Sequence, residues 1–200
     1  MKKIFLTQRL EKIGKHKELR NNLDVRFTLF FQALGILPII LPNELNYTKI
    51  IFKKIKPDGI VLSPGGNALK KDNRHKLEKF LINYAIKNKI PLLGVCRGAQ
   101  VLNIFFGGKI IKFKDHINKK HKLIGDIIEK KYNKTKSLCF HDYGINKNSL
   151  SKKLQILAYT NDGSIECFLH TKYKIMGMMW HPERNKKITK FDMEIIKKFF

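Results

Sequence analysis

A cysteine between two glycines, at the end of an apolar run, constrains the fold of this chain more than any other feature. The apolar residues 90–95 lead into Gly94-Val95-Cys96-Arg97-Gly98, and a helical spacing follows over residues 98–106. Gly-x-nucleophile-x-Gly at a strand-to-helix turn places the central side chain on a tight bend above a sheet. The helix would point its N-terminus at the sulfur and favour the thiolate. We therefore expect Cys96 to be a nucleophile; the alternative is a buried structural cysteine beside two incidental glycines.

Apolar runs of strand length alternate with helical spacing in the first half of the chain. Such alternation predicts an α/β fold with a mostly parallel open sheet and helices on both faces. The expected strands are residues 4–7, 36–41, 59–62 and 91–95, and the expected helices are residues 25–34, 74–88 and 98–106. Later runs leave little room for helices and predict antiparallel additions to the sheet, before a closing helix at residues 189–200. These runs are residues 109–113, 123–129, 154–159, 165–170 and 174–179.

The net charge of +25 comes almost entirely from lysines that are scattered through every segment. A nucleic-acid-binding surface would instead cluster Lys and Arg on one element with interleaved aromatic residues, so we expect no nucleic-acid partner. The richness in Lys, Ile and Asn is typical of AT-rich coding. A polyanionic small substrate fits the charge at least as well as a nucleic acid does.

Length, hydropathy and cysteine content further restrict the class of protein to which this chain can belong. Two hundred residues suit a single domain, residues 1–200. No apolar run has membrane length, so we expect no membrane contact. The three cysteines are far apart and odd in number, which gives no disulfide framework and favours the cytoplasm. The spacing of His116, His121 and His141 matches no strong zinc pattern, so we expect no metal.

A second motif, Trp180-His181-Pro182-Glu183, ends the apolar run that begins at residue 175. Residues two apart in an extended segment point the same way, so Glu183 can bond the far nitrogen of His181. His181 would take the proton of the Cys96 thiol and later protonate the leaving group, while Glu183 orients the imidazole. A lone histidine near a strand end is usually structural, but the cysteine elbow in the same chain favours a catalytic role.

The third component of such a site is a pair of backbone amides that face a developing negative oxygen. The amide of Arg97, directly after Cys96, would supply one. The segment Pro64-Gly65-Gly66 follows another expected strand. Glycine lets a backbone approach the substrate closely, so we expect Gly66 to supply the second amide. A plain turn is the alternative interpretation of this tripeptide.

The segment from Gly94 to Gln100 and the Trp-His-Pro-Glu motif resemble those of the class I glutamine amidotransferase-like family. The resemblance covers essentially the whole chain. It implies a γ-glutamyl thioester on Cys96, and no cofactor is expected. It also implies that a small γ-glutamyl compound is the substrate. The residues expected to hold this substrate are Gly65, Gln100, Cys139, Phe140 and His141.

The free-standing γ-glutamyl hydrolases are the branch of this family that the chain resembles more. A long segment, residues 8–24, separates the first strand from the first helix, and Asn161-Asp162-Gly163-Ser164-Ile165-Glu166 resembles the Asp-Gly-x-x-Glu pattern of that branch. Residues 138–143 depart from the Asn-Ser-x-His-His-Gln that such relatives often carry. A glutaminase subunit that passes ammonia to a synthetase remains an alternative, as does a hydrolase of γ-glutamyl-γ-aminobutyrate. A non-catalytic binding protein is disfavoured because the cysteine, histidine and glutamate are all present.

Within this branch the resemblance extends to hydrolases of γ-glutamyl-CDP-amidate. These release glutamate and cytidine diphosphoramidate during bacterial capsule phosphoramidate synthesis, and no partner protein would be required. A diphosphate calls for cationic side chains at the pocket rim. The expected ones are Arg9, Lys15 and Arg20 before the first helix, with Lys70, Lys71 and Arg74 as further candidates. The alternative for each of these cationic side chains is that it is a solvated charge on the surface. Cys139 and Cys167 are expected to be thiols that pack in the core.

Overall fold

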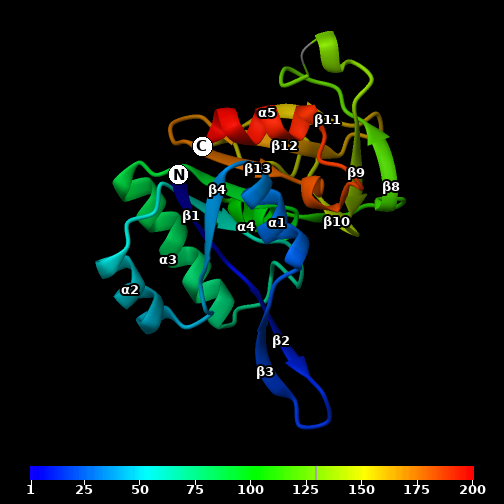
Figure 1. Cartoon of the computed structure of the whole chain (residues 1–200). Helices are drawn as coiled ribbons and strands as arrows, with labels where there is room; N and C mark the ends of the chain where they lie inside the picture. Colours follow the sequence, from blue (N-terminus) through cyan, green and yellow to red (C-terminus); the bar gives the residue numbers. More distant parts are fainter. Residues whose placement is uncertain (129) are drawn as a thin grey trace.

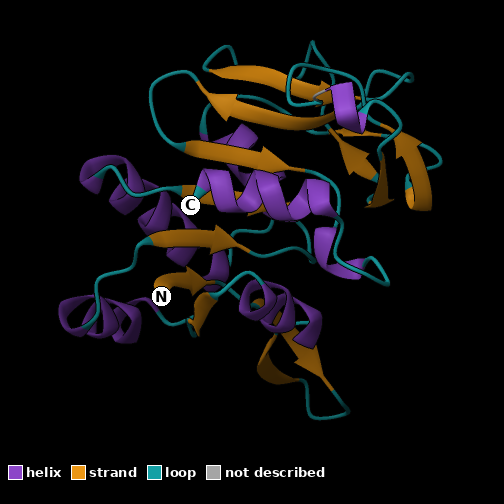
Figure 2. Ribbon diagram, turned by 45° about the horizontal axis from the view of Figure 1, so that its top comes forward, coloured by secondary structure: helices purple, strands orange, loops and turns teal. Residues whose placement is uncertain are grey.

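A seven-stranded sheet forms the centre of the molecule in the computed structural model, which describes residues 1–128 and 130–200 (Figure 1, Figure 2). Its strands, in spatial order, are β11 (Leu154–Tyr159), β12 (Ile165–His170), β13 (Ile175–Met178), β6 (Leu92–Val95), β5 (Gly59–Leu62), β1 (Lys2–Leu6) and β4 (Ile36–Ile40). The strands pair in parallel, except that β12 runs antiparallel to both of its neighbours. The prediction of a mostly parallel sheet is therefore confirmed.

The strand β13 is antiparallel to only one of its two neighbours, although the sequence predicted that the later strands would join the sheet as antiparallel additions. The antiparallel pairing is confirmed for β11 with β12 and for β12 with β13, so two reversals leave β13 parallel to β6. Gly177 lies opposite Gly94 in that register. Because the carboxyl ends of parallel strands meet at one edge of a sheet, the residues after β13 lie beside the residues after β6.

Three two-stranded ladders lie outside the central sheet, and two of them come from the second half of the chain. The run expected as a strand over residues 109–113 forms only two paired residues. The prediction of a strand at residues 123–129 was wrong, because Gly125 adopts φ +133 and turns the chain after the strand has ended; residue 129 lies outside the described residues. The paired segments are β7 (Ile111–Lys112) with β10 (Tyr143–Gly144), and β8 (Ile117–Lys122) with β9 (Lys136–Phe140).

Helices cover both faces of the central sheet. Side chains alternate along a strand, so Ile4 and Leu6 of β1 face one side while Phe5 faces the other. The helices are α1 (Val25–Ala33), α2 (Leu45–Lys54), α3 (Asn73–Asn88), α4 (Arg97–Phe105) and α5 (Lys190–Phe199), with 3-10 turns η1 (Lys130–Tyr132) and η2 (Pro182–Arg184). The first face packs against α1 and α5, and the second packs against α2, α3 and α4. Of the five α-helices among the described residues, α2 was not expected from the sequence.

Local signals set where the helices begin and end. Asp24 and Thr189 accept hydrogen bonds from amides in the first turns of α1 and α5, as N-cap residues do. Gly35 follows α1 with φ +73, a left-handed conformation that suits glycine. In the part of the chain that the structure describes, no helix is long and apolar enough to cross a membrane.

The segment between β1 and α1 is a hairpin that projects from the body of the molecule (Figure 1). Its strands are β2 (Arg9–Ile13) and β3 (Glu18–Asn22). Asn43 fixes the base of the hairpin, because its side-chain amide donates to the carbonyl oxygens of Gln8 and Arg9, both at 3.2 Å. Arg9 therefore stays at the body of the protein, whereas Lys15 lies in the turn at the far end of the hairpin.

Candidate active site

Cys96 lies on a tight turn between β6 and α4. Its φ of +50° and ψ of −105° are unusual for a residue with a side chain, and such strain persists only where the surroundings hold it. The Cys96 amide donates to the Met178 carbonyl at 2.7 Å. A Cβ on Gly98 would lie 2.2 Å from the Leu62 carbonyl oxygen, and one on Gly94 would lie 2.5 Å from the Gly98 carbonyl carbon. The two flanking glycines are therefore required by the close crossing of strand and helix.

His181 and Glu183 follow β13 and lie at the same edge of the sheet. The Nδ1 atom of His181 is 2.7 Å from Oε1 of Glu183, and both side chains are buried. Pro182 begins the 3-10 turn η2, which brings Glu183 back toward the imidazole. The Phe140 ring meets the imidazole of His181 edge-on, with 5.7 Å between the ring centroids. The histidine is thus held on one side by a carboxylate and on another by an aromatic ring.

The charges of Cys96 and His181 depend on burial and on each other. Burial alone would raise the pKa of the Cys96 thiol, but the charge and hydrogen bond of His181 and the backbone amide of Arg97 hold it below its ordinary value. Burial alone would lower the pKa of His181, but the Cys96 thiolate and Glu183 raise it to about 9. The site therefore favours a thiolate beside an imidazolium at neutral pH.

The Pro64-Gly65-Gly66 loop is held by a buried ion network that the sequence interpretation missed. Arg74 donates to the Gly65 carbonyl at 2.7 Å and to Glu78 at 2.8 Å. Glu78 also accepts from the guanidinium of Arg97, at 2.6 Å and 2.7 Å. The only signal in the sequence was the i, i+4 spacing of Arg74 and Glu78 on one helix. This network ties the loop to the first residue of α4.

Arg74 had been a candidate phosphate ligand, and the structure corrects that expectation. Its side chain is buried and occupied by Glu78 and by the loop carbonyls. Burial, which outweighs the nearby Glu78 carboxylate, lowers the Arg74 pKa to about 10, and the residue remains cationic at neutral pH. Its charge therefore balances Glu78 inside the protein and is not available to a bound anion.

A cavity of about 390 Å³ lies over Cys96. Cys96 is only 6% exposed and forms part of the cavity floor, with His181 beside it. Gly66 lies next to Arg97: a Cβ on Gly66 would be 3.9 Å from Cδ of Arg97. Gln100 donates to the Tyr143 carbonyl at 2.6 Å. The predicted residues that line this cavity are Arg9, Gly65, Gly66, Cys96, Arg97, Gln100, Phe140, His141 and His181.

Several predicted substrate-binding residues lie away from this cavity. Arg20, on the projecting hairpin, pairs with Glu18 at 2.6 Å, and Lys15 is exposed in the hairpin turn. Cys139 is fully buried, with its sulfur 3.4 Å from Oε2 of Glu166. Lys70 is exposed and pairs with Asp72 at 3.3 Å. Lys15, Arg20 and Cys139 are therefore not part of the cavity lining.

Arg184 is a cavity residue that the sequence interpretation did not consider. Its guanidinium carbon lies 4.4 Å from the centroid of the Phe140 ring, and its Nε atom lies 3.5 Å from Oε1 of Glu183. Its position in the sequence, directly after His181-Pro182-Glu183, is the signal that places it near the site. Three arginines line the cavity, and Arg9 and Arg184 are the two whose guanidinium groups are not held by Glu78, as that of Arg97 is.

Comparison with known proteins identifies the family. A family model described as glutamine amidotransferase class-I matches residues 30–200. The chain belongs to this family. The enzymes of the family are cysteine amidohydrolases, so this chain is a class I glutamine amidotransferase-like amidohydrolase. The elbow at Cys96 and the His181–Glu183 pair lie within the matched residues.

Individual relatives support the same family assignment. The chain is 32% identical over 211 residues to a γ-glutamyl-CDP-amidate hydrolase of Campylobacter jejuni subsp. jejuni, covering 98% of this chain and 96% of that protein. It is 32% identical over 161 residues to anthranilate synthase component 2 of Cyanophora paradoxa, covering 77% of this chain and 81% of that one. A crystal structure of a GMP synthase subunit from Thermoplasma acidophilum superposes with a TM-score of 0.71 at 22% identity, over 100% of this chain and 92% of that chain. The structural likeness confirms the fold.

Proposed function

We propose that this protein hydrolyses a γ-glutamyl amide through a thioester on Cys96. The observation that carries the proposal is the thiol at the floor of the cavity, beside an imidazole that a buried carboxylate holds at 2.7 Å. The same geometry favours the thiolate, which is the nucleophilic form of cysteine.

The reaction would proceed in two halves. The Cys96 thiolate attacks the γ-carbonyl carbon, and the amides of Arg97 and Gly66 stabilise the oxyanion. The C–N bond then breaks as the His181 imidazolium gives its proton to the leaving amine, which leaves a neutral imidazole. In the second half, His181 takes a proton from water, the hydroxide attacks the thioester, and the thiolate leaves with glutamate as product. Glu183 stabilises the imidazolium each time it forms.

We propose γ-glutamyl-CDP-amidate as the substrate, with glutamate and cytidine diphosphoramidate as products. The likeness to the Campylobacter hydrolase, which extends over 98% of this chain, supports this choice. Two of the cavity arginines, Arg9 and Arg184, support it further because a diphosphate is held well by guanidinium groups. Each charge-assisted hydrogen bond contributes about 1.5–3 kcal/mol, so two of them would give a strong preference for the nucleotide-linked substrate.

A glutaminase subunit is the second candidate. The specific observation in its favour is the 32% identity to anthranilate synthase component 2, a relative named as a component of a synthase. The two candidates differ in what the isolated chain does. A free-standing hydrolase releases glutamate by itself, whereas a glutaminase subunit would need its synthetase partner for full activity.

Glutamate release by the isolated chain tests the proposal. The panel contains γ-glutamyl-CDP-amidate, γ-glutamyl-γ-aminobutyrate and L-glutamine, and we expect the first to have the highest kcat/KM by at least about 100-fold. Equal turnover of γ-glutamyl-γ-aminobutyrate would replace the nucleotide assignment with a general hydrolase. Activity that requires an added synthetase would favour the subunit.

A matched pair of arginine variants sharpens this test. Arg9→Ala and Arg20→Ala remove the same charge, but only Arg9 lines the cavity, while Arg20 is exposed on the hairpin. We expect Arg9→Ala to lower kcat/KM for the nucleotide substrate by about tenfold or more while glutamine hydrolysis stays nearly constant. Arg20→Ala should change neither. Equal effects of the two variants would contradict a diphosphate site at Arg9.

A further inference from the structure

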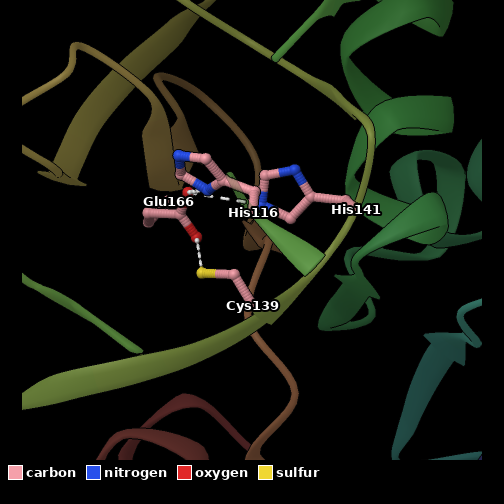
Figure 3. Close-up of side chains that lie close together, drawn as sticks. All are labelled: His116, Cys139, His141 and Glu166. Carbon is pink, nitrogen blue, oxygen red and sulfur yellow. Dashed lines mark hydrogen bonds and ion pairs between the residues drawn. The ribbon is translucent and has the colours of Figure 1, made fainter. Parts of the chain in front are cut away.

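A second group of chemically active side chains lies buried next to the cavity wall. Figure 3 shows His116, Cys139, His141 and Glu166, with the Glu166 carboxylate between the sulfur and the two imidazoles. All four residues are buried, and one ligand atom from each lies within 4.8 Å of the other three. His116 precedes β8, Cys139 is on β9, His141 directly follows β9, and Glu166 is on β12. The proposed amide hydrolysis uses neither the sulfur of Cys139 nor the carboxylate of Glu166.

The distances from Glu166 to the two imidazoles suit a shared cation better than direct hydrogen bonds, while the Cys139 sulfur is at hydrogen-bonding distance from the same carboxylate. Oε1 of Glu166 lies 3.6 Å from Nδ1 of His116 and 3.5 Å from Nε2 of His141, while Oε2 lies 3.4 Å from the Cys139 sulfur. Hydrogen bonds between nitrogen and oxygen are normally shorter, at about 2.7–3.2 Å. Donors on one tetrahedral zinc ion are about 3.3–3.6 Å apart, given bonds of about 2.0–2.3 Å.

Buried ring nitrogens that make no hydrogen bond point to the same conclusion. Nδ1 of His116 and both ring nitrogens of His141 are buried and have no hydrogen-bond partner among the described residues. A buried polar atom without a hydrogen bond destabilises the fold, so native proteins rarely leave several together. A cation bonded to Nδ1 of His116 and to Nε2 of His141 would satisfy two of these three atoms at once.

The surroundings of the cluster resemble the outer shell of a metal site. A metal-bound histidine usually donates its other ring N–H to a carboxylate, which fixes the ring. Nε2 of His116 is 2.7 Å from Oδ2 of Asp162. The hydroxyl of Ser164 donates to Oε1 of Glu166 at 2.8 Å, which holds the carboxylate in place. Both supports come from the Asp-Gly-x-x-Glu segment at the start of β12.

We propose that His116, Cys139, His141 and Glu166 bind a structural zinc ion. Two imidazoles, one thiolate and one carboxylate supply four buried ligands, all of residue types that bind zinc, and four ligands complete the tetrahedral coordination of a closed site. The sequence-based expectation of no metal rested on spacing along the chain, and these ligands come from segments that only the fold brings together. The proposal does not depend on the γ-glutamyl chemistry.

The site would fix one wall of the cavity. Phe140 lies between the ligands Cys139 and His141, and its ring contacts both His181 and Arg184. The Leu138 carbonyl accepts a hydrogen bond from the amide of His181 at 3.2 Å. Zinc would link β8, β9 and β12. It would therefore hold Phe140 and this wall of the cavity in a fixed position beside His181.

Metal content gives the first test. We would use the Cys96→Ala chain, because it removes the other cysteine–histidine pair that could bind a metal. Inductively coupled plasma mass spectrometry on protein purified without chelators should find about one zinc per chain. After chelation, titration with Co²⁺ should produce a thiolate-to-cobalt absorption band, and added zinc should raise the melting temperature of the metal-free chain.

Three variants in the same background assign the ligands. Cys139→Ser should abolish the cobalt band, whereas Cys167→Ser, which changes another buried cysteine outside the cluster, should keep it. Asp162→Asn alters only the outer carboxylate and should weaken zinc binding by about 10–100-fold. If Cys139→Ser does not fold, two measurements still test the zinc site. These are the cobalt titration of the Cys96→Ala chain and the loss of zinc affinity in Asp162→Asn.

Three results would overturn the proposal. The first is a Cys96→Ala chain that purifies without zinc and shows neither a cobalt band nor a higher melting temperature with added zinc. The second is a zinc affinity that Asp162→Asn and Cys139→Ser both leave unchanged. The third is a stoichiometric metal other than zinc at these residues, which would overturn the identity of the ion.

Discussion

Two sets of cysteine, histidine and glutamate lie near the cavity, and their different geometry gives them different chemistry. The elbow set is Cys96, His181 and Glu183, and the strand set is Cys139, His141 and Glu166. In the elbow set the carboxylate is 2.7 Å from the imidazole. In the strand set the carboxylate is 3.5 Å from the imidazole and within 3.4 Å of the sulfur.

The position of the carboxylate explains why the pKa of the thiol is lowered in one set and raised in the other. Glu183 contacts His181, so Cys96 faces an imidazolium that lowers its pKa despite burial. Burial and then the charge of Glu166 raise the pKa of Cys139 far above its ordinary value. The backbone differs as well, because Cys96 lies on a strained turn at the cavity floor and Cys139 lies within β9. The same three residue types therefore favour a nucleophile in one arrangement and a closed ligand set in the other.

The largest expected effect is the loss of activity in Cys96→Ala. We expect kcat/KM to fall by about 10⁴-fold or more, because no other group in the cavity can form the thioester. Cys167→Ala, at a buried cysteine in neither set, should stay within a few-fold of the unmodified enzyme. Adding His181→Ala to Cys96→Ala should cost little more, since residues that act as a unit are not additive. Additive losses in glutamate-release assays would show that the elbow set does not share one mechanism.

The two glutamates give the next contrast. Glu183→Gln should lower kcat by about 10²-fold with little change in KM, because it weakens the stabilisation of the imidazolium. Glu166→Gln should act mainly on folding, since its carboxylate is buried among the strand set, and the melting temperature is the measurement. A Glu166→Gln chain with an unchanged melting temperature and a loss of kcat as large as that of Glu183→Gln would remove the distinction between the sets.

The pH profile of kcat/KM tests the thiolate–imidazolium pair. The pKa of Cys96 is lowered, so the thiolate persists at neutral pH and is lost only as the pH falls through that lowered value. The pKa of His181 is raised to about 9, so the cation that protonates the leaving group is lost above that pH. We expect an acid limb with a slope of about tenfold per pH unit and an alkaline limb near pH 9, both belonging to the coupled pair. A profile without an acid limb would contradict the pair.

Alkylation gives the smallest of these effects. Brief treatment with iodoacetamide should label Cys96 several-fold faster than Cys139 or Cys167, because reactivity follows the thiolate fraction and access. Burial, followed by the charge of Glu166, raises the pKa of both other thiols. Mass spectrometry of the native protein measures the three rates separately. Faster labelling of Cys139 would show that the buried set, and not the elbow, holds the reactive sulfur.

Much of the fold followed from local patterns. The strands expected at residues 59–62, 154–159 and 165–170 have those bounds in the structure, because apolar runs bounded by Gly, Pro or polar residues report burial directly. The hairpin between β1 and α1 did not follow, since none of its strand residues is buried and the strands carry no apolar periodicity. The helix α2 was missed as well.

For the candidate site, the sequence by itself determined the elbow and the His181–Glu183 pair, because each depends on residues that are close in the chain. Only the tertiary structure decided which cations reach the cavity: Arg9 and Arg184 line it, while Arg74 is buried against Glu78. It also decided that Cys139 meets Glu166, 27 positions away in the chain. The physical reason is that burial and donor distances depend on how separate strands register and pack, and spacing along the chain does not encode either.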